Sequence, residues 1–119
     1  MTHRIKSEIH VKGWGHEEWI INNELYCGKI LKFNAGKRCS YHFHMLKTET
    51  FYIQDGKIRV IYSYGDDIQH ANTVELSAGE IFHVPVGLRH QIVAIEVSNV
   101  FEFSTPHYEE DSYRIIRGD

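Results

Sequence analysis

Apolar and polar residues alternate along most of the chain, so every second residue in these runs is apolar. This is the period of a β-strand with one buried face. Such runs cover residues 25–33, 40–44, 50–53, 58–62, 81–84, 91–97, 100–103 and 113–116. No window longer than ten residues shows a helical period, although residues 17–22 suit a helical turn or a strand equally well.

Turn-forming residues separate these runs. Asp55-Gly56 lies between two alternating runs and predicts a hairpin, and Ser98-Asn99 predicts a turn between the last two long strands. Further turns are expected at residues 34–36, 64–67 and 77–80. About eight to ten short strands at this spacing predict an all-β jelly-roll barrel, with residues 1–119 forming one domain.

Composition narrows the class of protein. The chain is 42% hydrophobic and 13% aromatic, which is enough for a core, and its formal net charge of −3 argues against a nucleic-acid partner. The two cysteines imply no disulfide framework. No apolar run is long enough for a membrane span or a signal peptide, so we expect a cytoplasmic protein with no membrane partner.

Candidate chemistry lies in residues 36–56. His42 and His44 are two residues apart on a predicted strand, so both side chains face the same side, with Cα atoms roughly 6.5 Å apart. Glu49 begins the next predicted strand and could face the same point. The alternatives are two barrel-lining histidines bonded to neighbours, or two surface histidines.

The wider pattern resembles the cupin superfamily. The spacing Gly36-x5-His42-x-His44-x4-Glu49-x6-Gly56 matches the first cupin motif at every position. The second motif, residues 79–94, is matched by Gly79-x5-Pro85-x-Gly87-x2-His90 and departs only at Ala94, where asparagine is frequent. The resemblance implies a jelly-roll barrel in which one divalent ion is bound by His42, His44, Glu49 and His90.

The ligand set leaves the identity of the ion open. Three imidazoles and one carboxylate suit borderline divalent ions. Zinc or manganese is expected first, and iron, nickel and cobalt are the alternatives. Such an ion keeps open positions for water or substrate when it is five- or six-coordinate.

The flanking segments are similar to the C-terminal cupin domain of type II mannose-6-phosphate isomerases. The matching positions are Trp14-Gly15, Arg38, Ser40, Glu102, Asp111 and Arg114. Two positions differ, because Gly13 replaces a proline and His42 stands where these isomerases usually have glutamine. The resemblance therefore implies a sugar or sugar phosphate as substrate more strongly than mannose 6-phosphate itself.

Roles can be assigned to further residues on this hypothesis. Glu102 is the first candidate for the catalytic base and His83 the second, with a solvent-facing carboxylate and a core histidine as the structural alternatives. Arg38 and Arg114 could bind a phosphate, and Tyr52 could stack on a sugar, although surface ion pairs and core packing are their ordinary roles. Lys47 is expected at the exposed rim of the barrel.

Three functions follow from these observations. The first is a metal-dependent aldose–ketose isomerase or epimerase acting on a sugar or sugar phosphate. The second is a dioxygenase using iron or nickel, and the third is a non-catalytic module that binds a small carbohydrate. A homodimer is expected from the resemblance.

Overall fold

The computed structural model describes residues 3–119, which contain eleven β-strands and two short 3-10 helices. The elements are β1 (Glu8–Lys12), β2 (Gly15–Asn22), β3 (Cys27–Phe33), β4 (Tyr41–Phe43), β5 (Glu49–Asp55), β6 (Lys57–Ser63), η1 (Ile68–His70), β7 (Asn72–Ser77), β8 (Ile81–Val84), β9 (Arg89–Ala94), β10 (Ser98–Ser104), η2 (Glu109–Asp111) and β11 (Tyr113–Ile116). No helix within residues 3–119 is long and apolar enough to cross a bilayer.

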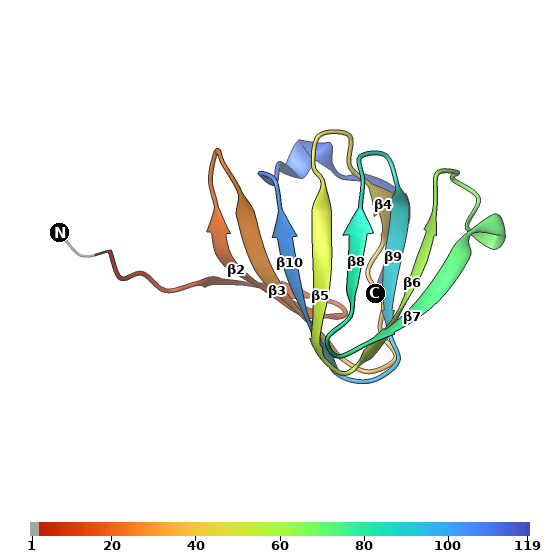
Figure 1. The fold of residues 1–119 in the computed structure, drawn as a ribbon, viewed down its shortest axis with the longest axis horizontal. Coiled ribbons are helices and arrows are strands. Elements are labelled where there is room, and N and C mark those ends of the chain that lie inside the picture. The colour runs from red at the N-terminus through yellow and green to blue at the C-terminus, as the bar shows by residue number, and fades with distance from the viewer. Residues whose placement is uncertain (1–2) are drawn as a thin grey trace.

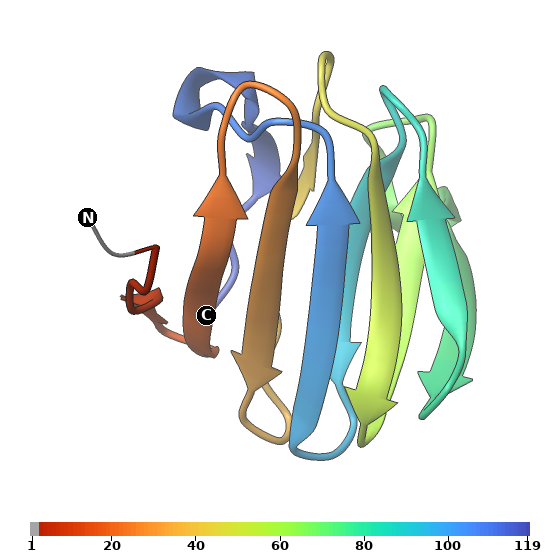
Figure 2. The same ribbon diagram turned by 60° about the vertical axis from the view of Figure 1, so that its left-hand side comes forward.

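The strands form two antiparallel sheets that face each other (Figures 1 and 2). One, which we call sheet A, has the order β1-β2-β3-β10-β5-β8, and the other, sheet B, has the order β11-β4-β9-β6-β7. Side chains from both sheets meet between them, among them Phe33, Ile53, Ile58, Ile92 and Val100, each at most 1% exposed. The predicted all-β jelly roll is confirmed.

The alternating sequence pattern explains which face of each strand is buried. In β5, Glu49, Phe51 and Ile53 are buried while the residues between them are partly exposed. In β3, Leu31 and Phe33 lie inside with the same period. Each strand of a half-buried sheet must place alternate residues in the core, so the period of two is preserved in the burial pattern.

Two strands were missed by the sequence pattern, β1 and β7. β1 lies at one edge of sheet A and β7 at one edge of sheet B, and most of their side chains are exposed. An edge strand has fewer neighbours to bury against, so its sequence carries a weaker apolar alternation. The ambiguous segment 17–22 belongs to β2, because it pairs with β1 on one side and β3 on the other.

Two turn predictions were wrong in detail. Asp55-Gly56 does not close a hairpin, because β5 belongs to sheet A and β6 to sheet B, so the turn carries the chain from one sheet to the other. Gly56 has φ +87°, and a Cβ there would lie 2.4 Å from the carbonyl oxygen of Val97. The later turn spans residues 95–97, since Ser98 is fully buried and starts β10, with its hydroxyl accepting from the Lys57 amide.

Candidate metal centre

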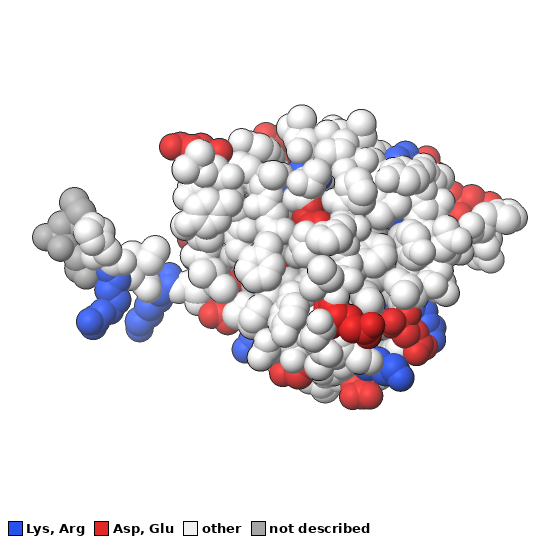
Figure 3. All heavy atoms as spheres, viewed as in Figure 1, with Lys and Arg blue, Asp and Glu red and all other residues white. Residues whose placement is uncertain are grey.

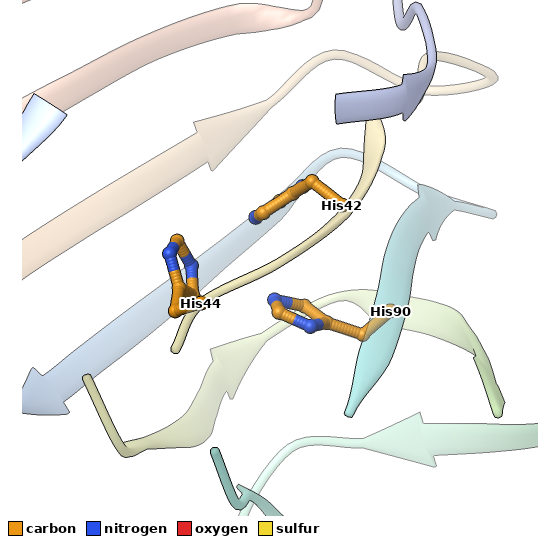
Figure 4. Close-up of side chains that lie close together, drawn as sticks. All are labelled: His42, His44 and His90. Atoms are coloured by element: carbon orange, nitrogen blue, oxygen red, sulfur yellow. The ribbon is translucent and has the colours of Figure 1, made fainter. Parts of the chain in front are cut away.

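Three imidazole rings converge inside the barrel (Figure 4). His42 on β4 is directly opposite His90 on β9 in the register of sheet B, and His44 follows the end of β4 on the same side as His42. One ring nitrogen from each of the three histidines lies within 4.8 Å of the others. The group could hold a metal ion, and its members come from the two motifs singled out in the sequence.

Backbone carbonyls fix the tautomer of each ring. Nδ1 of His42 lies 2.9 Å from the Ser40 carbonyl oxygen, and Nδ1 of His90 lies 2.9 Å from that of Leu88. Nδ1 of His44 lies 3.0 Å from the carbonyl oxygen of Asp111. A carbonyl can only accept, so each Nδ1 carries the proton and each Nε2 presents a lone pair for ligation.

Glu49 reaches the same point from sheet A, the sheet opposite His42 and His90. Its Oε2 lies 3.0 Å from Nε2 of His90 and 3.4 Å from Nε2 of His44. Among the described residues, neither Glu49 Oε2 nor His90 Nε2 has a hydrogen-bond partner, although both are buried. The lone pair on His90 Nε2 and the carboxylate oxygen of Glu49 are both acceptors, and no donor lies between them. A bound cation would satisfy both, so the four residues fit a divalent ion.

The electrostatic environment prepares the ligands for a cation. Burial, together with the neighbouring His90 and His44, holds the pKa of His42 well below its usual value, so the ring is neutral. Burial alone would raise the pKa of Glu49, but the charge of Lys47, whose Nζ lies 3.2 Å from Oε1, opposes burial, and the pKa lies well below its usual value. Glu49 is therefore a carboxylate, as metal binding requires.

Lys47 is buried beside this site, and the prediction that it lies exposed at the rim was wrong. Only 3% of the residue is exposed, and Nζ donates to Glu49 Oε1 at 3.2 Å, to Glu102 Oε2 at 3.2 Å and to His107 Nδ1 at 3.0 Å. Burial opposes the charge, but Glu102 and Glu49 raise the pKa of Lys47 above its usual value. Lys47 lies in the loop between β4 and β5, where no strand period applies, so the sequence pattern did not indicate its inward position.

Glu102 points into the barrel, where 5% of the residue is exposed. It lies on β10, opposite Lys29 on β3 and Phe51 on β5. Burial and the nearby Glu49 raise the pKa of Glu102, while Lys47 opposes this shift. Sequence reasoning left open whether this carboxylate faces the barrel or the solvent, and the inward position is the one observed. Its role as a base stays a prediction.

His107 is a member of the site that sequence reasoning did not single out. Besides accepting from Lys47, its ring packs edge-on against His44 at 6.4 Å. Burial, followed by the charges of Lys47 and Lys29, lowers the pKa of His107 to about 4. It lies in the segment between β10 and η2, where no strand period applies, so the sequence carried no signal for its position.

The metal group opens into a cavity of about 280 Å³ between the two sheets. The wall includes apolar side chains such as Trp14 and Phe51 and polar ones such as Lys29, Glu102 and Arg114. Arg114 on β11 is directly opposite His42 in sheet B. Of the three residues proposed to bind substrate, Arg114 is therefore the one that lines the cavity.

The other candidate site residues lie elsewhere. His83 is exposed on the outer face of sheet A, where it is hydrogen-bonded to Thr50 Oγ1 at 2.8 Å, so it does not line the barrel as expected for a base. Tyr52 is on the same outer face, because its neighbours Phe51 and Ile53 occupy the inner one. Arg38 is exposed and lines no part of the cavity.

Asp111 supports the metal group from behind. Its carboxylate accepts from the backbone amides of Met45, Leu46 and Lys47, at 2.8 to 3.2 Å, and its carbonyl accepts from His44. The residue is 2% exposed. Asp111 thus holds the loop that carries Lys47. It also orients the ring of His44, which is 67 positions away in sequence.

A comparison with known protein families decides the classification. The profile described as Cupin matches residues 6–114. The chain belongs to the cupin family. The match confirms the resemblance to the cupin superfamily. No curated protein sequence matches this cupin.

Solved structures agree on the fold. The capsular polysaccharide assembling protein CapF from Staphylococcus aureus superposes with a TM-score of 0.80 at 18% identity over 93% of this cupin and 33% of CapF. KdgF from Halomonas sp. gives 0.73 at 20% identity over 89% and 92% of the two chains. Oxalate decarboxylase from Bacillus subtilis gives 0.76 at 18% identity, covering 91% of this chain and 30% of that enzyme.

These similarities establish the fold alone, because all three identities are low. The cupin spans about a third of the length of CapF and of oxalate decarboxylase, and most of the length of KdgF. A fold hosts many chemistries, so the reaction has to be argued from the site.

Proposed function

We propose that this cupin is a metal-dependent isomerase or epimerase of a sugar or sugar phosphate, related in action to the mannose-6-phosphate isomerases. The observation that carries the proposal is the buried carboxylate of Glu102 in the same cavity as the candidate ligands, linked through Lys47 to Glu49. A proton transfer between adjacent carbons needs a base and an electrophile in one enclosed site.

Each polar group of the site has a role in this reaction. The ion, bound by His42, His44, Glu49 and His90, would supply Lewis acidity toward two vicinal sugar oxygens. Zinc or manganese is our first expectation for it. Glu102 takes the proton from C2 of the aldose and returns it to C1, while a hydroxyl proton moves from O2 to O1. Atoms and electrons balance without a redox partner.

Lys47, Lys29 and Arg114 supply the positive charge that the base and an anionic substrate need. The Lys47 ammonium lies 3.2 Å from Glu102 and offsets its charge during proton transfer. Lys29 and Arg114 line the same cavity and supply positive charge for an anionic substrate, and a guanidinium fork suits phosphate. This supports a sugar phosphate over a neutral sugar.

The test combines metal analysis with exchange in heavy water. Purified protein is assayed for bound metal and incubated in D₂O with a panel of aldose and ketose phosphates, and the products are followed by NMR. We expect metal-dependent interconversion with deuterium entering at the carbon next to the carbonyl. Glu96→Gln, an exposed carboxylate, should leave turnover unchanged, and Glu102→Gln should abolish it.

The same experiment separates the alternatives. Oxygen consumption on substrate addition, with iron or nickel bound, would contradict the isomerase and favour a dioxygenase. Saturable metal-dependent binding with no deuterium incorporation across the panel would also contradict it, in favour of a non-catalytic carbohydrate-binding module.

A further inference from the structure

The three residues that follow β11 form part of the cavity wall, although they belong to neither sheet. On one side they contact Gly13, in the turn between β1 and β2 of sheet A. On the other side they contact residues 38–40, which precede β4 of sheet B. The segment therefore closes the cavity between the two sheets, and we call it the latch: Arg117, Gly118 and Asp119.

Glycines allow the latch to pack closely on both sides. A Cβ at Gly13 would lie 2.2 Å from the carbonyl carbon of Asp119, and a Cβ at Gly118 would lie 2.4 Å from the carbonyl carbon of Cys39. No side chain fits in so short a space between two backbones, so these contacts require glycine. A methyl group added at Gly118 must displace the latch from residues 38–40.

The latch is held less firmly than the other irregular segment of the cavity wall, residues 105–112. Reciprocal hydrogen bonds with Asn22 hold that segment, and its Asp111 carboxylate accepts from three backbone amides. Within residues 3–119, two hydrogen bonds hold the latch, from the Asp119 amide to the Arg38 carbonyl at 3.0 Å and from the Arg38 amide to the Asp119 carboxylate at 2.8 Å. A segment with few and exposed hydrogen bonds opens at a lower free energy than its surroundings.

The latch also carries positive charge into the cavity wall. Arg117 lines the cavity together with Lys12, Lys29 and Arg114, and within residues 3–119 neither arginine forms an ion pair. The outer surface over the central strands of sheet A is mostly uncharged, with acidic and basic atoms gathered mainly toward the edges (Figure 3). An anionic group is therefore favoured inside the cavity, where a guanidinium can bind it with two parallel hydrogen bonds.

We propose that the latch is a gate, which leaves residues 38–40 to admit a ligand and then closes over the anionic group of that ligand through Arg117. The class of ligand rests on the proposed function, in which the substrate is a sugar phosphate. An anion that contacts Arg117 in the closed state and not in the open state shifts the equilibrium toward closure.

Cys39 reports the opening of the latch, because its thiol is half-buried in the cavity wall and its backbone packs against Gly118. The full chain is labelled with neutral N-ethylmaleimide, and mass spectrometry of peptides measures the rate at Cys39. We expect Gly118→Ala to raise this rate at least about tenfold at an unchanged urea midpoint, since overpacking by a methyl group costs about 1–3 kcal/mol locally. Gly65→Ala is the matched control, because a Cβ there would lie 3.6 Å from Ser63 Oγ, and it should keep the wild-type rate.

Inorganic phosphate is the probe for closure. It should slow Cys39 labelling and also slow deuterium exchange of the Asp119 amide, which is bonded to the Arg38 carbonyl only when the latch is closed. Arg117→Gln should remove both effects, and Lys32→Gln, at an exposed position outside the cavity, should keep them. Neither readout needs turnover, so this inference and the proposed isomerase can fail independently.

Three results would overturn the proposal. One is an equal Cys39 labelling rate in folded Gly118→Ala and Gly65→Ala. Another is a faster rate that is fully explained by a lower urea midpoint, because it would report global unfolding. The third is slower labelling in phosphate with unchanged exchange of the Asp119 amide, because phosphate would then only fill the cavity. Asp119→Ala, which removes the acceptor of the Arg38 amide, replaces Gly118→Ala if that variant does not fold.

Discussion

Nζ of Lys47 lies 3.2 Å from Oε2 of Glu102 in the interior of the barrel. The residues are 55 positions apart in sequence, and each is at most 5% exposed. The same ammonium contacts Glu49, so one positive charge lies between a candidate metal ligand and the candidate base.

Lys47→Met should destabilise the fold strongly. The substitution leaves Glu49 and Glu102 buried without their shared counter-ion, and loss of one member of a buried pair costs about 3–5 kcal/mol. Urea unfolding measures the change in free energy. Lys37→Met, at an exposed position, is the control, and Lys47→Met combined with Glu102→Gln should recover part of the loss. Equal midpoints for Lys47→Met and the wild type would contradict the pairing.

Glu102→Gln should keep the metal but lose turnover in the proposed isomerisation. An amide of the same shape cannot accept the substrate proton, and a positioned base contributes about 10²–10⁴-fold. Single-turnover NMR measures the rate, and elemental analysis checks that metal content is retained. Turnover within a factor of a few of wild type would remove Glu102 from the mechanism.

His44→Ala should strip the metal and lower the melting temperature in the presence of metal. An ion that binds only the folded chain stabilises it by about 2.7 kcal/mol at a hundredfold excess over Kd. His83→Ala is the matched control, since His83 lies outside the cavity. Elemental analysis that finds equal metal in both variants would refute the ligand assignment.

Asp111→Ala should weaken metal binding although Asp111 is not a proposed ligand. It removes the acceptor of three loop amides and loosens the segment whose carbonyl orients His44. Such supporting residues typically contribute 10–100-fold in metal affinity. Competition with a chelating dye measures Kd, and Glu110→Ala, at an exposed neighbour, should leave Kd unchanged. The same Kd in both variants would show that the loop holds His44 without Asp111.

Cys39 is half-buried in the wall of the cavity and should react slowly with thiol reagents in the native protein. Burial raises the pKa of this thiol from 9.0 to about 12, so at pH 8 only roughly one thiol in ten thousand is ionised. Because the folded state keeps a proton that the unfolded state releases, its contribution to stability is complete below pH 9 and declines as pH rises toward 12.

Labelling with a chromogenic disulfide checks the reactivity of Cys39. The pKa of Cys27 is also raised by burial, so we expect no fast-reacting thiol in the native protein and two in denaturant. Cys39→Ala should flatten the alkaline decline in unfolding free energy. Rapid native labelling of Cys39 would contradict the raised pKa of this half-buried thiol.

Local sequence predicted the central strands of the fold and the four candidate ligands. The period of two predicted the central strands, and the motif spacing named His42, His44, Glu49 and His90, which the tertiary structure brings together. These features depend on neighbours along the chain: side chains alternate on a strand, and glycine turns occur where the backbone requires them. The edge strands β1 and β7 were missed because little of their surface is buried.

What the sequence by itself determined is the jelly-roll class and a four-residue set with the right chemistry for a divalent ion. The tertiary structure alone decided which other groups join it. It placed Glu49 across from His42 on the opposite sheet, buried Lys47 against Glu102, and turned His83 and Tyr52 to the outside. These placements depend on how strands far apart in sequence pair and stack, which the alternation within a single strand does not encode.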